Sequence, residues 1–196
     1  ARMNDERADI PADFLTKCGV APATVARPAA METLCADLMA ANEKTNLTRI
    51  TGRDAFWVLH VADSLAAGLF FPQLTGDACT AADIGCGAGF PLLPLAWANP
   101  RLAITGIDRR KKKADFAAAA IAKCGLTNAT VVRRQAREHD GRYDYVLLRA
   151  AGKPAKMVRE VRRLLAPGGR IVFYATPSSA AADLPLARRE AEKFGL

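Results

Sequence analysis

The 196-residue chain divides into two parts that differ in how apolar and polar residues alternate. Between residues 8 and 72, apolar side chains recur every three or four positions, which is the spacing of one helix face, and no strand pattern occurs. The clearest stripe is Met31, Leu34, Cys35, Leu38 and Met39. We therefore predict that the N-terminal part forms a helical cap.

A second cap helix is predicted to begin after Thr51 and Gly52 and to end at Pro72. Asp54 would lie in its first turn, where a negative charge is favourable beside the helix N-terminus. Its expected apolar positions include Phe56, Leu59 and Leu65.

From about residue 79, short apolar runs alternate with alanine-rich helical segments. This alternation is typical of β-α-β units, which build a parallel sheet with helices on its faces. Strands are predicted near 80–84, 103–107, 129–133, 143–148 and 169–174, and helices near 89–98, 111–124, 153–165 and 179–194. The predicted organisation is a cap, residues 1–77, followed by an α/β core, residues 78–196.

The first predicted strand runs directly into a glycine-rich turn, residues 85–89. Glycine lets the backbone bend sharply and approach a ligand closely. The spacing is G-x-G-x-G, whereas the dinucleotide fingerprint is G-x-G-x-x-G, and position 90 is phenylalanine. Asp83 precedes the turn and suits a cationic sulfonium better than a pyrophosphate. The turn thus favours S-adenosylmethionine as cofactor, and a tight connection without a ligand is the alternative.

Asp108 follows the second predicted strand, where a carboxylate can accept hydrogen bonds from both hydroxyls of a ribose. The alternative is that Asp108 caps the next helix. After the third strand, the backbone at Ala136 and Arg137 is expected to pass beside an adenine. That expectation follows from topology alone, and an ordinary loop is the alternative.

The chain carries 28 Lys and Arg against 20 Asp and Glu, a formal net charge of +8, which favours a polyanionic partner such as nucleic acid. Five basic residues, 109–113, stand together where a helix is predicted to begin, and the expected nucleic-acid contacts are the first four: Arg109, Arg110, Lys111 and Lys112. Positive charge there opposes the helix dipole, so local stability does not explain the run. Contact with RNA phosphates explains it, and a solvated charged face is the alternative.

The five cysteines form no C-x-x-C pair, and the two histidines do not flank them at zinc-like spacing. No metal site is therefore predicted. The odd number of cysteines, with no signal peptide or long apolar span, indicates a reducing, cytoplasmic compartment and no membrane partner.

In order along the chain, these residues resemble the bacterial small-subunit ribosomal RNA guanine-N7 methyltransferases, a family also called glucose-inhibited division protein B. The similar segments, within about residues 30 to 175, are Asn46-Leu47-Thr48, then His60, Asp63, Ser64 and Leu65, then Asp83 to Pro91, Asp108 with the following lysines and Phe116, Arg149-Ala150, and Pro167-Gly168-Gly169. The N-terminal segment and Arg149-Ala150 are the family-specific parts. The resemblance implies a class I S-adenosylmethionine-dependent methyltransferase with a Rossmann-like, mostly parallel sheet.

The resemblance also implies a set of site residues. Together with the residues singled out above, the expected cofactor site is Asp83, Gly85, Gly87, Gly89, Phe90, Asp108, Ala136, Arg137 and Arg149. His60 and Asp63 share a helix face that, in the family, closes over the cleft and contacts the substrate. The alternative is that this face docks the cap onto the core.

The sequence leaves several roles open for Arg149. Its planar guanidinium could bind a guanine edge or a phosphate, or contact the cofactor as the resemblance implies. The alternative is a surface ion pair with Asp144 or Glu138.

The chain departs from the family in two places. The family usually has an acidic residue where Arg137 stands, so the adenine-side contact is expected from the main chain or in altered form. Family members also continue with two further strands, so the core is expected to lack the usual last two.

The implied reaction is transfer of a methyl group to N7 of a guanine in 16S ribosomal RNA, free or in the small ribosomal subunit, by a monomeric enzyme. Guanine N7 carries a free lone pair, so the enzyme has to align the reactants and exclude water, and no catalytic acid or base is predicted. Two alternatives remain: a methyltransferase that acts on a protein or small molecule, and a catalytically silent RNA-binding relative.

Overall fold

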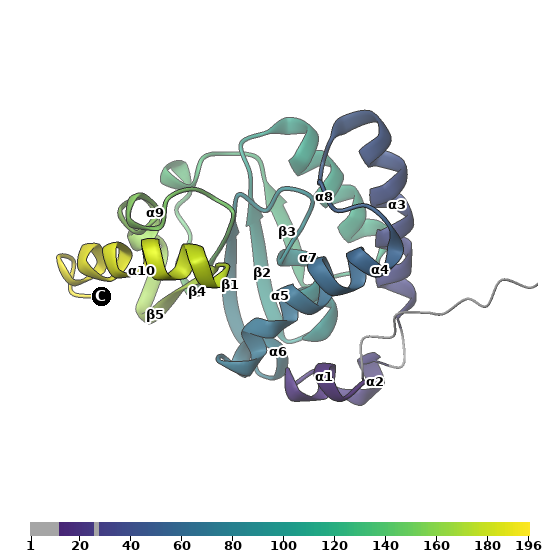
Figure 1. Ribbon diagram of the computed structural model, residues 1–196, viewed down its shortest axis with the longest axis horizontal. Coiled ribbons are helices and arrows are strands. Elements are labelled where there is room, and N and C mark those ends of the chain that lie inside the picture. The colour runs from purple at the N-terminus through teal and green to yellow at the C-terminus, as the bar shows by residue number, and fades with distance from the viewer. Residues whose placement is uncertain (1–11, 26–27) are drawn as a thin grey trace, which may run out of the picture.

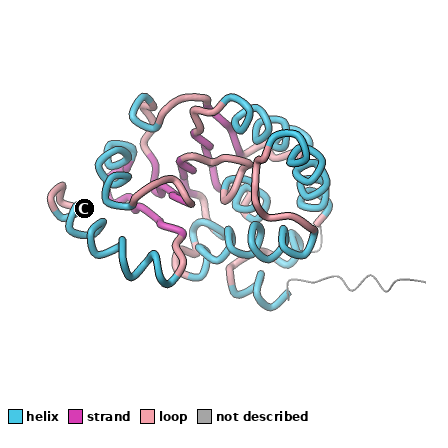
Figure 2. The backbone as a smooth tube through the Cα atoms, turned by 45° about the horizontal axis from the view of Figure 1, so that its top comes forward, coloured by secondary structure: helices cyan, strands magenta, loops and turns pink. Residues whose placement is uncertain are grey.

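The computed structural model describes residues 12–25 and 28–196, so the predicted helical pattern at residues 8–11 lies outside the described residues (Figure 1). Five parallel strands form one sheet in the order β3-β2-β1-β4-β5. The strands are β1 (Cys79–Ile84), β2 (Leu102–Ile107), β3 (Ala129–Val132), β4 (Tyr143–Arg149) and β5 (Leu165–Tyr174). Helices lie on both sides of the strands (Figure 2). The predicted α/β fold with a parallel sheet is confirmed.

The helices follow the predicted order closely. They are α1 (Ala12–Lys17), α2 (Pro22–Val25), α3 (Ala29–Thr45), α4 (Arg53–Phe56), α5 (Asp63–Leu65), α6 (Gln73–Gly76), α7 (Leu92–Ala98), α8 (Lys111–Lys123), α9 (Pro154–Val161) and α10 (Pro177–Glu192). A π-helical turn, Trp57–Ala62, joins α4 to α5. Shorter 3-10 turns span Ala66–Leu69, Ala136–Glu138 and Arg162–Leu164. No described helix is both long and apolar enough to span a bilayer.

The last strand begins earlier than predicted, at Leu165 rather than near residue 169. Its pairing with β4 is irregular, because Tyr143 faces Leu165 whereas Tyr145 faces Arg170. Pro167 falls in the interval and has no backbone N–H to donate to the ladder. The chain therefore bulges at this point, which the hydrophobic pattern alone does not reveal.

Alternate residues of each strand face two separate cores, as the period of a strand requires. Ala81, Ile104 and Leu147 pack on the side of α3 and α7. Ile84 and Ile107 pack on the opposite side, in the same core as Met157 and Val161 of α9. This division decides which side chains can reach each end of the sheet.

The cap packs on the first of these faces through α3, which lies beside α7 and α8 (Figure 1). Met31, Leu34 and Leu38 are fully buried, as predicted. The expectation that Leu59 occupies an apolar position is wrong, because Leu59 is 49% exposed. In the helical segment 53–65, the buried residues instead recur as adjacent pairs every four positions: Phe56 and Trp57, His60 and Val61, and Ser64 and Leu65. Leu59 lies outside that buried stripe.

The packing of α1 against the end of the cap generates a prediction about Gly68. The Thr75 hydroxyl donates to the Cys18 carbonyl at 2.5 Å, and a Cβ on Gly68 would meet that carbonyl and come within 2.6 Å of the hydroxyl oxygen. We expect Gly68→Ala to lower the free energy of unfolding by about 2–4 kcal/mol, since backbone atoms cannot move aside. Urea unfolding measures this. Gly76→Ala is the control, because no atom lies within 4 Å of its added Cβ; equal losses for both variants would contradict the packing described.

Candidate functional site

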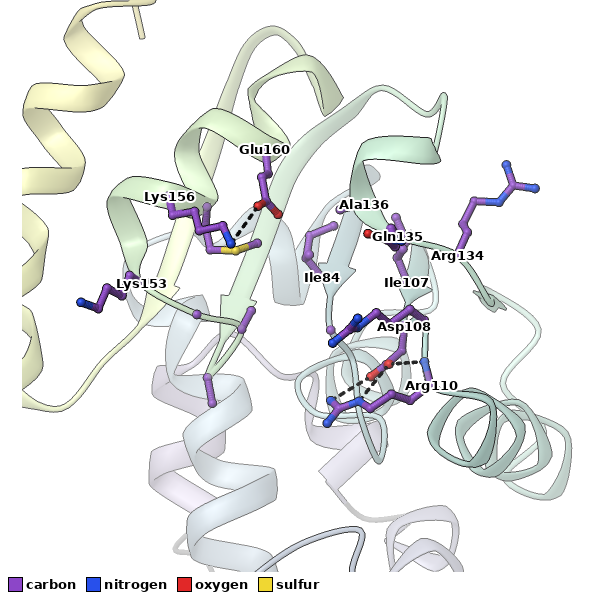
Figure 3. Close-up of a pocket in the computed structure, with 16 residues that line it drawn as sticks. Ile84, Ile107, Asp108, Arg110, Arg134, Gln135, Ala136, Lys153, Lys156 and Glu160 are labelled. Atoms are coloured by element: carbon purple, nitrogen blue, oxygen red, sulfur yellow. Dashed lines mark hydrogen bonds and ion pairs between the residues drawn. The ribbon is translucent and has the colours of Figure 1, made fainter.

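A cavity of about 680 Å³ opens at the carboxyl ends of the strands, where open α/β sheets bind ligands (Figure 3). It is lined by Ile84, Gly85, Ile107, Asp108, Arg109, Arg110, Arg134, Gln135, Ala136, Ala150, Ala151, Gly152, Lys153, Lys156, Met157 and Glu160. The segments that follow β1, β2, β3 and β4 all contribute. Residues from four distant parts of the sequence therefore meet around one space.

The glycine turn and Asp108 meet at this cavity. Gly85 and Asp108 both line it, and the Gly87 N–H donates to Asp108 Oδ2 at 3.0 Å. Gly85 has φ +70°, a conformation that residues with a Cβ rarely adopt. The bend and the carboxylate predicted from the sequence thus face one cavity.

Asp108 is almost fully buried and is held by its own loop. Its Oδ1 accepts a hydrogen bond from the Arg110 backbone N–H at 2.8 Å, and the Arg110 guanidinium lies 3.3 and 3.4 Å from the two carboxylate oxygens. Helix α8 begins at Lys111 with Arg110 at the N-cap position. The alternative that Asp108 caps this helix is therefore wrong.

Asp83 lies on the other face of the sheet and does not line the cavity. It shares the cap-side face with Ala81, because residues two apart on a strand point the same way. Its carboxylate accepts a hydrogen bond from the Leu92 N–H at 3.1 Å, and burial raises its pKa to about 7. The expectation that this carboxylate faces a sulfonium therefore needs correction: Asp83 holds the start of α7.

Three other predicted site residues also lie outside the cavity lining: Gly87, Gly89 and Phe90. The Phe90 ring is buried and stacks on the His60 ring, with centroids 4.0 Å apart and an interplanar angle of 12°. A Cβ on Gly89 would collide with the Leu93 side chain. These residues shape the turn and join it to the cap.

The segment after β3 is divided in the same way. Gln135 and Ala136 line the cavity, whereas the Arg137 side chain is exposed and its nearest acid is Glu138, at 3.9 Å. Successive residues of the short 3-10 turn point in different directions, so only part of it faces the space. A side-chain contact from Arg137 to a ligand in the cavity is not supported by this arrangement.

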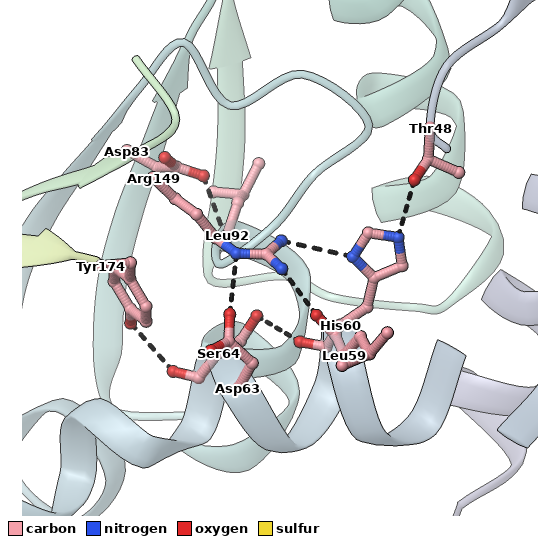
Figure 4. Close-up of polar contacts among 9 residues, drawn as sticks. All are labelled: Thr48, Leu59, His60, Asp63, Ser64, Asp83, Leu92, Arg149 and Tyr174. Carbon is pink, nitrogen blue, oxygen red and sulfur yellow. Dashed lines mark hydrogen bonds and ion pairs between the residues drawn. The ribbon is translucent and has the colours of Figure 1, made fainter. Parts of the chain in front are cut away.

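Arg149 lies at the end of β4 and is clamped by the cap (Figure 4). Its Nε donates to Asp63 Oδ2 at 2.9 Å, its Nη2 donates to the Leu59 carbonyl at 2.6 Å, and its Nη1 lies 3.2 Å from His60 Nδ1. The alternative pairing with Asp144 or Glu138 is wrong. Asp144 instead accepts hydrogen bonds from Thr80. His60 and Asp63 thus dock the cap onto the core through Arg149.

The contacts of His60 determine its protonation. Because Arg149 can only donate, Nδ1 must accept, and the ring proton lies on Nε2, which is 3.1 Å from the Thr48 hydroxyl oxygen. Burial, and then the charge of Arg149, lowers the His60 pKa to about 4. His60 is therefore neutral at ordinary pH and supplies a polar contact rather than a charge.

The mouth of the cavity is more basic than the sequence motifs indicate. Arg109 and Arg110 line it, as part of the predicted basic run. Arg134, Lys153 and Lys156 line it as well and were not singled out in the sequence. Their positions just after β3 and β4 are the signal that could have identified them, because the carboxyl ends of parallel strands meet at one edge.

The parallel sheet, the glycine turn after β1 and the acid after β2 define the fold of a class I S-adenosylmethionine-dependent methyltransferase. A solved structure of similar fold is the ribosomal protein L11 methylase from Lactobacillus delbrueckii subsp. bulgaricus, with a TM-score of 0.53, 16% identity and coverage of 67% of each chain. The predicted fold class is confirmed.

The chain belongs to the family described as rRNA small subunit methyltransferase G (GidB), whose model matches residues 27–191. It is 36% identical over 163 residues to the ribosomal RNA small subunit methyltransferase G of Gloeobacter violaceus, covering 80% of this chain and 64% of that relative. The protein of the same name from Deinococcus radiodurans is 38% identical over 168 residues, covering 83% and 65%. The chain thus spans a little under two thirds of the length of these curated relatives.

The buried groups around Arg149 generate a prediction about pH. With its folded pKa raised from 3.8 to about 7, Asp83 keeps a proton that the unfolded chain releases, so its contribution to stability falls as pH rises through that window. With its folded pKa lowered from 6.5 to about 4, His60 lacks a proton that the unfolded chain binds, so its contribution rises as pH rises. In the wild type, the two groups therefore change the free energy of unfolding in opposite directions as pH rises.

Removing one group should therefore expose the slope of the other. Between about pH 4.5 and 6, His60→Gln should lose about 2 kcal/mol of stability relative to wild type as pH rises, and Asp83→Asn should gain a similar amount. Urea unfolding at several pH values measures both slopes. The exposed Asp115→Asn is the control and should run parallel to wild type; parallel curves for all three variants would contradict the assignment.

Proposed function

We propose that this chain binds S-adenosylmethionine in the cavity and transfers its methyl group to N7 of a guanine in 16S ribosomal RNA. The observation that carries the proposal is that Gly85 and Asp108 line one cavity and that their loops are hydrogen-bonded to each other. Family membership supports the reaction and the substrate. We further propose that it acts as a monomer in the cytoplasm, with the cap (1–77) closing one side of a core (78–196).

The residues present fit this cofactor. Gly85 offers backbone without a side chain, and Asp108 offers two carboxylate oxygens of the kind that accept hydrogen bonds from ribose hydroxyls. Ile84, Ile107 and Met157 provide apolar walls for an aromatic base. We assign the cofactor contacts to these residues and to the backbone at Ala136.

Chemically, the reaction requires alignment rather than proton transfer. S-adenosylmethionine, when bound, supplies an electrophilic methyl group to the N7 lone pair, and the electrons of the broken carbon–sulfur bond remain on sulfur. The protein's part is to hold both reactants and to keep water out. Arg149 takes part as a positioning residue, because its guanidinium is engaged by the cap.

The Arg110 guanidinium contacts the Asp108 carboxylate, to which the ribose hydroxyls would donate. Cofactor binding would therefore exchange this contact for the ribose hydroxyls and leave Arg110 among the other basic side chains at the mouth. Positive side chains there are suited to the RNA backbone. The cofactor and the RNA would thus engage neighbouring parts of the same loop.

The central test uses radiolabelled cofactor and unmethylated small ribosomal subunits, followed by mapping of the labelled base. Asp108→Ala should weaken cofactor binding by about 1–3 kcal/mol in calorimetry, through loss of charge-assisted hydrogen bonds. Asp115→Ala, on the exposed face of α8, is the matched control and should bind as wild type. Label on a protein or small molecule, or a folded protein that binds no cofactor, would overturn the proposal.

A second test concerns the basic run. Arg109→Ala and Lys112→Ala should each reduce the slope of log affinity against log salt for ribosomal RNA by about 0.7–0.9, because each removes one phosphate contact. Filter binding across a salt series measures the slope. Lys44→Ala, exposed on the cap, should leave it unchanged. Unchanged slopes for the first two would instead identify a solvated charged face.

A further inference from the structure

A second hollow, of about 190 Å³, lies beside the larger cavity at the carboxyl ends of β4 and β5. The first turns of α10 form its opposite wall, through Ser179 and Asp183. The two hollows share the backbone segment 150–152, which connects β4 to the loop before α9. They are therefore neighbours at the same edge of the sheet.

The walls of the second hollow have the composition of a site for a planar base. Phe173 supplies an aromatic ring, and Leu148 and Pro154 supply aliphatic surface. Enzymes that act on an unstacked base hold it between such side chains and read its Watson–Crick edge with hydrogen bonds. Only one charged side chain lines this hollow among the described residues, and it is Asp183.

Asp183 is half-buried, and it forms no hydrogen bond or ion pair within the part of the chain that the structure describes. The chain as a whole has a net charge of +8, which attracts RNA phosphates, whereas an unpaired carboxylate repels them locally. Its position is understandable if a ligand supplies donors to it. A carboxylate has two acceptor oxygens and no donor, so it fits a group with two adjacent N–H donors.

We propose that this hollow is the subsite for the target guanine and that Asp183 accepts hydrogen bonds from its N1–H and N2–H₂ groups. The inference rests on the proposed function and names the residue that selects the base. Adenine and cytosine present a ring nitrogen acceptor at the corresponding edge, which repels a carboxylate. Guanine is thus the base that satisfies Asp183 with a pair of donors.

This orientation directs the reactive nitrogen toward the cofactor cavity. N7 lies on the Hoogsteen edge of guanine, away from the N1–H and N2–H₂ groups that Asp183 would hold, and that edge would face the shared segment 150–152. Its residues, Ala150, Ala151 and Gly152, line both hollows and carry no side chain larger than a methyl group. Ala150 has φ +52°, a strained conformation of the kind found at functional sites.

The test is the nearly isosteric Asp183→Asn variant, compared with Glu192→Gln, an exposed position on the same helix. Asp183→Asn should lower kcat/KM for methylation of small subunits about tenfold to 100-fold, because one of the two acceptors becomes a donor. Cofactor affinity in calorimetry should stay within twofold of wild type, and Glu192→Gln should match wild type in both measurements.

A second readout separates base recognition from a structural role. Inosine lacks the N2 amino group, so replacing the mapped guanosine by inosine in an RNA substrate should slow the wild type by about tenfold and Asp183→Asn much less. An unchanged guanosine-to-inosine ratio in the variant, or full activity of the variant, would overturn the subsite while leaving the proposed function intact. A wild type that binds cofactor but methylates no guanine would overturn both.

Discussion

The alternation of side chains along parallel strands is the constraint on which the rest of this molecule depends. At the carboxyl edge of the sheet, neighbouring residues point to opposite faces, so Asp83 and Ile84 serve different purposes although they are adjacent. One face holds buried polar groups that bind α7 and the cap, and the other holds the walls of the cavity. A shift of one residue in the register of β1 would exchange the faces on which its buried polar residues and its cavity-lining residues lie.

Arg149 connects these two faces. Its side chain is held on the cap side by Asp63, His60 and the Leu59 carbonyl, and the next residue turns into a left-handed conformation. The chain then enters the segment that lines both hollows. Removing one member of a half-buried ion pair leaves the partner charge poorly solvated, so loss of either Arg149 or Asp63 would destabilise the contact between cap and core. The cap thereby fixes the position of the backbone beside both hollows.

Much of this arrangement follows from sequence patterns. The positions of the strands, the glycine turn and Asp108 come from local periodicity and spacing, which short-range physics dictates. The face on which Asp83 lies also follows from the sequence pattern, since Ala81 and Asp83 must point the same way. Proximity to the turn alone favours a cofactor contact for Asp83, whereas alternation along the strand decides the face on which its side chain lies.

Other features could not be read from the sequence. The partners of Arg149 lie in a helix more than eighty positions earlier, and only tertiary packing brings them together. The early start of β5 depends on a bulge around Pro167, where apolar spacing gives no signal. The role of Asp183 could not be read from the sequence either, because it depends on the lack of a hydrogen-bond or ion-pair partner within the described structure and on no motif.

The placement of charge is compatible with the proposal that a basic chain presents an acidic side chain to RNA. Arg109, Arg134 and Lys153 surround the mouth of the larger cavity, where phosphates would approach, whereas Asp183 lies in the smaller hollow. Attraction between charges on the surface is screened within about 8–10 Å at physiological salt, so each local group acts mainly on what lies directly against it. Phosphates would then be drawn by the rim, and a base by the hollow. Binding strength and choice of base are thus assigned to different side chains, which is why the two can be tested by separate substitutions.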